Sequence, residues 1–201
     1  MKRALRPTGA ALAAALAAGC IAALMLAAAP RAGAYDYRVL HMIEDRHTHV
    51  VLRISEPPAG GDLPQRGRAA CADVPALDRR GRNRALAFGR MFQNSGIHVD
   101  LILTSRLCRN IQAAALMKIG PLTEQPLLDA PESGEIGEEQ TEALLGYLDG
   151  LRASETALLV AHGAVIEALT GERLEPGEGL VFTLPPFGEM TLRGRFDLPP
   201  H

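Results

Sequence analysis

Three short apolar runs, each ending in a polar residue, constrain the fold of this chain more than any other feature. They cover residues 49–53, 101–105 and 158–162, and they end in Arg53, Ser105 and His162. A run of this kind is typical of a strand that is buried on both faces of a parallel sheet. Because helical patterns lie between the runs, the sequence predicts a three-layer α/β/α domain with a mostly parallel central sheet. Open sheets of this type bind ligands at the carboxyl ends of their strands, where these polar residues lie.

The rest of the chain supplies the other elements of such a domain. Apolar residues at helical spacing predict helices over residues 78–95, 106–118, 138–153 and 163–170. Further strands are expected over residues 37–43, 126–128, 180–184 and 189–196, of which the last two form a hairpin. Asp78 and Ser105 are suited to cap the first two helices. Residues 55–71 are rich in Gly, Pro and Arg and are expected to form a long loop.

The first 34 residues are predicted to be an export signal. Lys2, Arg3 and Arg6 precede an almost unbroken apolar run over residues 10–29, and small residues at 32–34 suit a signal peptidase. We therefore expect a single mature domain over residues 35–201 in the periplasm or outside the cell. Two alternatives stay open. The apolar run could remain as an uncleaved anchor in the inner membrane, or Cys20 could be a lipoprotein site.

The charge of the mature chain argues against nucleic acid and anionic membranes as partners. Four of the 21 basic residues and none of the 23 acidic residues lie in the signal, which leaves 17 basic residues against 23 acidic ones, a net charge of about −6. Membrane contact is expected only through the N-terminal segment, if that segment is not cleaved. An anion site in this chain must therefore be built locally from arginines.

Two cysteines, Cys71 and Cys108, remain in the mature chain. An even count in an exported protein favours a disulfide, and the alternative is two free buried thiols. The bridge would close a loop of about 37 residues. Metal-ligand spacings such as CxxC and HExxH are absent from the sequence, as are GxGxxG and Walker loops, so we expect no metal and no cofactor.

Four polar residues are predicted to converge at the strand ends. Arg53, Ser105 and His162 end the three runs, and Arg109 lies one helical turn beyond Ser105. His162 also lies where a strand passes into a helix, whose N-terminus favours negative charge. Arginine forks bind tetrahedral oxyanions bidentately. The combination predicts a phosphate or sulfate site.

Three motifs in order resemble those of the histidine phosphatase superfamily, also called phosphoglycerate-mutase-like. The segment 77–82 resembles its Leu-Thr/Ser-x-x-Gly-x helix start, 105–113 its Ser-x-Leu-x-Arg motif, and 158–166 the strand of its second histidine. The likeness runs from about Val50 to Val181 and is strongest to small exported phosphohistidine-phosphatase-like members. It implies the phosphoglycerate-mutase-like fold and phosphate-binding roles for Arg53, Arg109 and His162.

The resemblance fails at the nucleophile. That superfamily's first motif is Arg-His-Gly or Arg-His-Ala, and its histidine attacks the phosphoryl group. This sequence has Ile54 in that place, and isoleucine has no lone pair. His49 lies five residues upstream, roughly 16 Å away along a strand, and Ser55 has no adjacent base.

No motif fixes a general acid. Glu132 and Glu135 lie in the loop where the superfamily places one, but this loop is acidic throughout, so an ordinary solvated loop is the alternative.

Three functions follow from this pattern. The favoured one is a pseudophosphatase that binds phosphate, a phosphorylated small molecule or a phosphorylated protein without turnover, because loss of a catalytic nucleophile removes about 10⁶ in rate. The second is a phosphate monoester or phosphohistidine hydrolase with altered chemistry. The third is a structural exported domain with a vestigial pocket.

Overall fold

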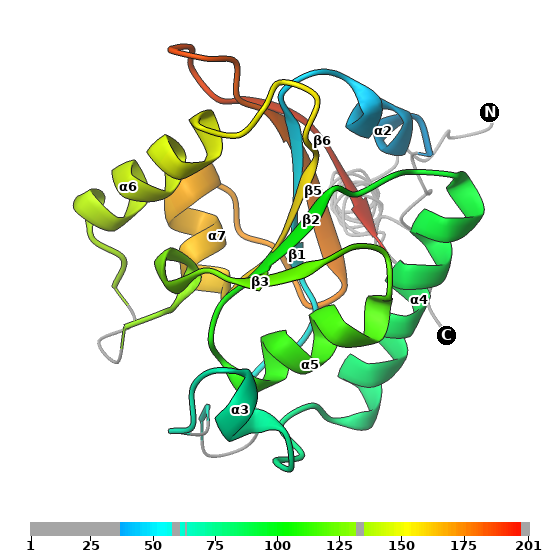
Figure 1. The fold of residues 1–201 in the computed structure, drawn as a ribbon, viewed down its shortest axis with the longest axis vertical. Helices are drawn as coiled ribbons and strands as arrows, with labels where there is room; N and C mark the ends of the chain where they lie inside the picture. The colour runs from blue at the N-terminus through cyan, green and yellow to red at the C-terminus, as the bar shows by residue number, and fades with distance from the viewer. Residues whose placement is uncertain (1–36, 58–60, 63, 132–134, 198–201) are drawn as a thin grey trace, which may run out of the picture. The chain divides into compact units, whose positions relative to one another are not determined.

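A six-stranded mixed sheet forms the centre of the fold (Figure 1). The computed structural model describes residues 37–57, 61–62, 64–131 and 135–197, so the predicted signal lies outside the described residues. The strands are β1 Thr48–Arg53, β2 Leu101–Thr104, β3 Leu122–Glu124, β4 Ala157–Val160, β5 Glu178–Thr183 and β6 Thr191–Asp197. Their order across the sheet is β3-β2-β4-β1-β5-β6.

The three runs that opened the sequence analysis are neighbours in this sheet. β4 pairs in parallel with β1 on one side and with β2 on the other, and Leu158 faces Val50 and Ile102 in register. β3 adds a fourth parallel strand, whereas β5 and β6 form the predicted antiparallel hairpin. The mostly parallel sheet is thereby confirmed. Because β1, β2 and β4 run the same way, their carboxyl ends meet at one edge.

Helices cover both faces of the sheet (Figure 1). The described α-helices are α2 Tyr37–His41, α3 Arg68–Cys71, α4 Arg79–Ser95, α5 Cys108–Met117, α6 Glu138–Asp149 and α7 Gly163–Thr170, with short 3-10 turns at η1 Met42–Glu44 and η2 Pro126–Leu128. Val50 and Leu52 of β1 pack in one core with apolar side chains of α4 and α5. Val51 packs in a second core with those of α6 and α7. This is the three-layer arrangement that the sequence predicted.

The α4 helix begins and ends as its sequence dictates. Asp78 is the N-cap, and its carboxylate accepts a hydrogen bond of 2.6 Å from the Gly81 N–H. Gly96 ends the helix in the left-handed conformation, with φ of 68°. Gly89 lies where α4 crosses α5, and a β-carbon there would overlap the backbone of Met117.

Two predicted strands are wrong. Residues 37–43 form α2 and part of η1, because Val39, Leu40 and Ile43 bury one face at helical spacing. Residues 126–128 form the turn η2, and the strand β3 lies just before it. Pro126 has no N–H to donate to a sheet, which explains why pairing ends at Glu124.

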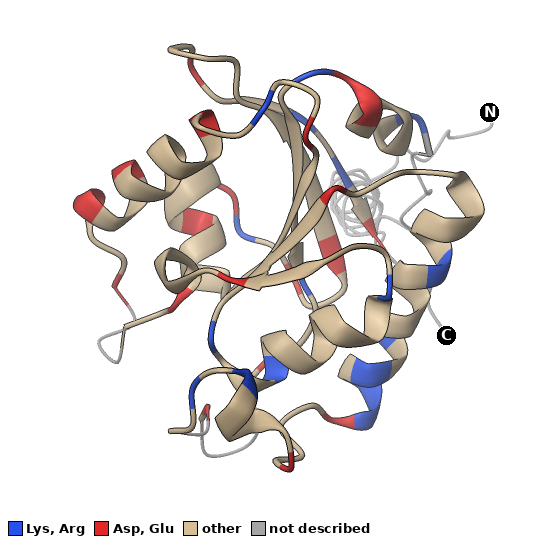
Figure 2. Ribbon diagram, in the orientation of Figure 1, with Lys and Arg blue, Asp and Glu red and all other residues tan. Residues whose placement is uncertain are grey.

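The two helical layers carry opposite charges (Figure 2). The sequence of α4 has five arginines and no acidic residue. The sequence of α6 has four acidic residues and no lysine or arginine. Anions are therefore attracted to the side of the sheet that α4 covers. No helix in the described ranges is long and apolar enough to span a membrane.

Candidate anion-binding site

Three of the four predicted site residues lie together at the carboxyl ends of β1, β2 and β4. Arg53 ends β1, Arg109 lies in the first turn of α5, and His162 is the residue before α7. A β-carbon on Gly163 would lie 3.3 Å from Cζ of Arg53, so the α7 N-terminus directly adjoins this guanidinium. Both arginines also act on His162: burial is the main reason that the pKa of His162 is lowered, and the charges of Arg109 and Arg53 lower it further. We call these three residues the anion cluster.

The guanidinium of Arg109 is already bound to an internal carboxylate. Nε donates to one oxygen of Asp62 at 2.5 Å, and Nη2 donates to the other at 3.1 Å. Nη1 donates to the Ser55 carbonyl at 2.9 Å, so three of the five N–H groups are used. The Arg109 side chain is 2% exposed. An incoming oxyanion must therefore replace Asp62 to form the same bidentate pair with Nε and Nη2 of Arg109.

Sequence reasoning missed Asp62. The residue lies in the long loop after β1, 47 positions before Arg109, and no motif marks it. The only signal is an acidic residue beside Gly61 in a loop that precedes Cys71. Asp62 nevertheless opposes the effect of the arginines on the pKa of His162, which places a negative charge in the same cluster.

The loop between α7 and β5 holds Arg53 in place. Its Nη1 donates to the Leu174 carbonyl at 2.6 Å, and its own carbonyl accepts from the Gly177 N–H at 2.7 Å. The side chain is half-buried. Among the described residues, Leu174 is the acceptor of the Arg53 side chain, which leaves its other N–H groups for a further acceptor.

The hydrogen bonds of His162 fix which ring nitrogen can donate. Nδ1 accepts from the Ala164 N–H at 3.1 Å, which caps α7. Because burial lowers the pKa of His162, the ring is neutral at pH 7. With Nδ1 as an acceptor, the single ring proton lies on Nε2. His162 is therefore suited to donate a hydrogen bond to an oxyanion rather than to attack phosphorus.

Ile54, at the expected nucleophile position, belongs to the hydrophobic core. Its side chain is 1% exposed and packs with Val50 and Leu52 beneath α4 and α5. His49 is no substitute, because it is 2% exposed near the start of β1 and its Nδ1 accepts from the Ala157 N–H at 3.3 Å.

Ser105, the fourth predicted residue, is turned inward. Its hydroxyl accepts from the Asn110 side chain at 2.8 Å and from the Leu107 N–H at 3.4 Å, and the residue has no exposed surface. The expected helix start at Arg106 is wrong: α5 begins at Cys108 with Leu107 as its N-cap. Ser105 instead braces the turn between β2 and α5, and its role as a phosphate ligand stays a prediction.

Of the two candidate acids, Glu135 is the one that the structure describes. Glu132 lies outside the described residues, and Glu135 is exposed in the segment before α6. The carboxylate that acts on His162 is Asp62. No group of three or more metal-ligating side chains occurs in the part of the chain that the structure describes.

The disulfide between Cys71 and Cys108 is present, as predicted. It joins α3 to the first residue of α5 across 37 positions, with 5.2 Å between the two α-carbons. Gln112 adds to this link, because its side-chain oxygen accepts from the Ala76 and Leu77 N–H groups at 3.2 Å each. The end of the long loop is thereby fixed beside Arg109.

The fold is shared with solved structures of phosphatases. The protein histidine phosphatase SixA in complex with tungstate matches with a TM-score of 0.56 and 14% identity, over 75% of this chain and 96% of that one. A protein described as a phosphohistidine phosphatase SixA from Nakamurella multipartitia matches with a TM-score of 0.56 and 17% identity, over 77% of this chain and 97% of that one. An Escherichia coli protein described as an alpha-ribazole-5'-P phosphatase matches with a TM-score of 0.56 and 16% identity, over 77% of this chain and 97% of that one.

At these identities the likenesses show the fold. The chain has a phosphoglycerate-mutase-like α/β fold, as the resemblance of its motifs implied. The SixA phosphohistidine phosphatases are among the proteins that share this fold with it. No protein-family model matches the sequence, and no curated protein matches it.

Proposed function

We propose that this protein is an exported pseudophosphatase, which binds phosphate or a phosphorylated small molecule or protein at the anion cluster without turning it over. One observation carries the proposal: the residue after Arg53 is an isoleucine with 1% exposure, packed in the core. A phosphoryl group at the cluster would find donors on Arg53, Arg109 and His162, but an isoleucine at the position of the superfamily's nucleophilic histidine. Phosphatases of the same fold support the choice of phosphate.

The pairing of Asp62 with Arg109 supports an anion at this position. Asp62 holds the guanidinium fork with both oxygens, which is the geometry in which a phosphate would bind. The internal carboxylate keeps the buried arginine paired when no ligand is bound. It also lowers the affinity for an external anion, since the two compete for the same N–H groups.

A turnover assay tests the absence of catalysis. The purified protein is incubated with an aryl phosphate beside a His162→Gln variant, and we expect no difference between the two rates. Turnover at a rate typical of phosphatases that is lost in His162→Gln would contradict the proposal and support a hydrolase with altered chemistry.

The Ile54→His variant tests the packing at the nucleophile position. We expect no gain in turnover, because the side chain at this position packs into the core. We also expect a loss of about 2–4 kcal/mol in the free energy of unfolding, since a polar ring replaces a buried apolar side chain. Ile54→Val is the control, with an expected loss of about 0.5–1.5 kcal/mol. A gain in activity would show that the position faces the anion cluster.

The Asp62→Asn variant tests anion binding. Removing the competing charge is expected to strengthen orthophosphate binding at least fivefold in calorimetric titrations. Asp129→Asn is a matched control, because Asp129 pairs with Arg106 outside the cluster. Asp62→Asn is also expected to lower the free energy of unfolding by roughly 3 kcal/mol, since Arg109 is left buried without a countercharge. If neither the unmodified protein nor Asp62→Asn bound orthophosphate, that result would contradict the proposed site.

Export is tested separately. The N-terminal residue of protein recovered from outside the cytoplasm is expected to be Tyr35, and recovery of the full-length chain from the membrane would support the anchor instead.

A further inference from the structure

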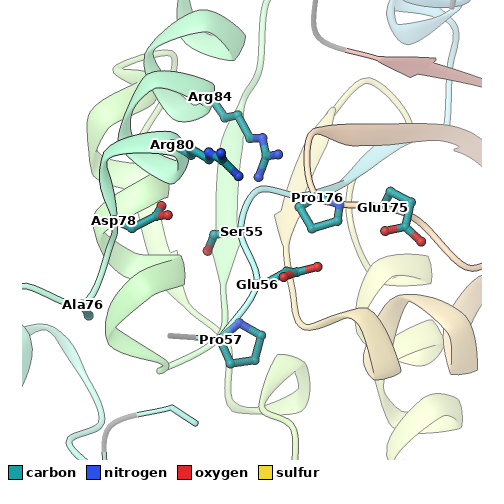
Figure 3. Close-up of a pocket in the computed structure, with 9 residues that line it drawn as sticks. All are labelled: Ser55, Glu56, Pro57, Ala76, Asp78, Arg80, Arg84, Glu175 and Pro176. Carbon is teal, nitrogen blue, oxygen red and sulfur yellow. The ribbon is translucent and has the colours of Figure 1, made fainter. Parts of the chain in front are cut away.

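Figure 3 shows a polar cavity, which we call the α4 pocket. It adjoins the anion cluster at Ser55, whose carbonyl accepts from Arg109. Its volume is about 560 Å³, and it lies between the start of α4, the turn after β1 and the loop that precedes β5. The lining residues that carry charge are Arg80, Arg84, Glu56, Asp78 and Glu175. Arg53, Arg109 and His162 are not among the described residues that line it. The α4 pocket therefore adjoins the anion cluster but is lined by a different set of charged side chains.

Two arginines on one wall of the α4 pocket lack a countercharge. Arg80 and Arg84 are one helical turn apart on α4, and both side chains extend into the cavity (Figure 3). Within the described part of the chain neither forms a salt bridge, and the hydrogen bond of Arg84 is a long one of 3.4 Å to the Ile54 carbonyl. Two adjacent guanidiniums whose forks are open can hold one oxyanion between them.

Two carboxylates face the same cavity from other elements. Glu56 follows β1 and Glu175 precedes β5 (Figure 3). Neither pairs with Arg80 or Arg84 among the described contacts, although Glu175 acts on the neighbouring Arg173. Asp78 is different, because its carboxylate caps α4. The cavity thus holds charges of both signs on separate walls, and they do not neutralise each other by direct contact.

Ser55 is an independent sign that the α4 pocket is incomplete. The residue lines the cavity and is 5% exposed. Its hydroxyl has no hydrogen-bond partner in the described part of the chain. A buried hydroxyl without a partner is unfavourable by about 1–3 kcal/mol, and a bound ligand can supply the missing acceptor.

We propose that the α4 pocket binds a small zwitterion. Its oxyanion, a phosphate or a carboxylate, lies between Arg80 and Arg84, and its ammonium group lies against Glu56 and Glu175. A purely anionic ligand would be repelled by the two glutamates, and a purely cationic one by the two arginines. A zwitterion can pair with the arginines and with the glutamates at the same time. The cavity volume is in the range of small-molecule sites.

Calorimetric titration of the full chain tests this site. The two zwitterionic probes are O-phosphoethanolamine and β-alanine, which distinguish a phosphate from a carboxylate as the oxyanion. Methyl phosphate and ethanolamine each carry one of the two charges. We expect one zwitterion to bind at least tenfold more tightly than either single-charge probe.

Variants locate the binding. Arg80→Gln combined with Arg84→Gln is expected to weaken zwitterion binding at least tenfold, and Glu56→Gln at least threefold. Arg90→Gln, on an exposed arginine of the same helix that does not line the cavity, is expected to change nothing. His162→Gln is expected to affect only binding at the anion cluster and to leave the zwitterion binding that depends on Arg80 and Arg84 unchanged. Melting temperatures show that each variant is folded.

Four results would overturn the proposal. Binding of neither zwitterion would exclude this class of ligand. So would binding of a single-charge probe that is as tight as that of the tighter zwitterion and is lost in the double arginine variant. An unchanged affinity in the double arginine variant would place the ligand elsewhere. Loss of zwitterion binding in His162→Gln would assign the binding to the anion cluster.

Discussion

His49 links the burial of one side chain in β1 to the pH dependence of the whole fold. The ring is 2% exposed, lies 5.6 Å from the Phe182 ring between centroids, and accepts a hydrogen bond from the backbone of β4. Burial, and to a smaller extent the charge of His47, lowers the pKa of His49 from 6.5 to about 4. The folded protein therefore keeps this ring neutral at pH values at which the unfolded chain is protonated.

The sign of the resulting pH dependence follows directly. Between pH 6.5 and about 4 the unfolded chain binds more protons at His49 than the folded protein does. The contribution of the neutral His49 ring to the free energy of unfolding is therefore fully present above pH 6.5. It is lost as the pH is lowered, by up to about 3 kcal/mol. A His49→Gln variant should show a shallower slope of unfolding free energy against pH, measured in urea at pH 7.5, 6 and 5. Because the pKa of His162 is also lowered, a weaker slope of the same sign should remain. An unchanged slope in His49→Gln would contradict this assignment.

At the same scale, the residues of the anion cluster differ in how far the sequence could predict them. Arg53, Arg109 and His162 follow strands whose apolar patterns are clear, so the parallel sheet brings them together. Asp62 could not be predicted, because its contact with Arg109 depends on the path of a loop. The orientation of Ser105 was also out of reach, since its hydroxyl is satisfied by Asn110 inside the next helix.

Among the helices, α4 and α6 contain glycines in opposite environments. A β-carbon on Gly89 would overlap the Met117 backbone where α4 crosses α5, whereas one on Gly146 in α6 would meet nothing within 4 Å. Gly89→Ala is expected to lower the free energy of unfolding by about 1–3 kcal/mol. Gly146→Ala is expected to raise it by about 0.5–1 kcal/mol, because alanine favours a helix interior. Urea unfolding of the two variants checks both signs, and destabilisation by Gly146→Ala would show a hidden contact of α6.

Element length decided which elements the sequence could predict. The long amphipathic pattern of α4 and the three apolar runs were clear, and each forms the expected element. The errors fall on short segments, because α2, β3 and η2 have three to five residues each. Over so few positions, helical and strand spacing cannot be told apart, and tertiary packing decides between them.

At the scale of the whole molecule, the disulfide joins the long loop to the layer of α4 and α5. Replacing both Cys71 and Cys108 with serine is expected to lower the free energy of unfolding by about 3–4 kcal/mol, as the chain-entropy model gives for a loop of this length. Urea unfolding measures the loss, and the unmodified protein in a reducing agent should show the same loss. Equal stability with and without the bridge would mean that Gln112 and the packing of α3 hold the loop by themselves.

The opposite charges of α4 and α6 give the domain an electric dipole (Figure 2). At pH 7 the formal net charge is −2 for the full chain and about −6 for residues 35–201, so bulk electrophoresis would class the protein as an anion. Close to a charged surface, however, the orientation of the molecule depends on the charge of the face nearest that surface and not on its net charge. The arginine-rich helix would turn toward a negatively charged matrix and the acidic helix toward the solvent. The protein would then be retained on a cation exchanger at low ionic strength despite its net charge, and modest salt would release it.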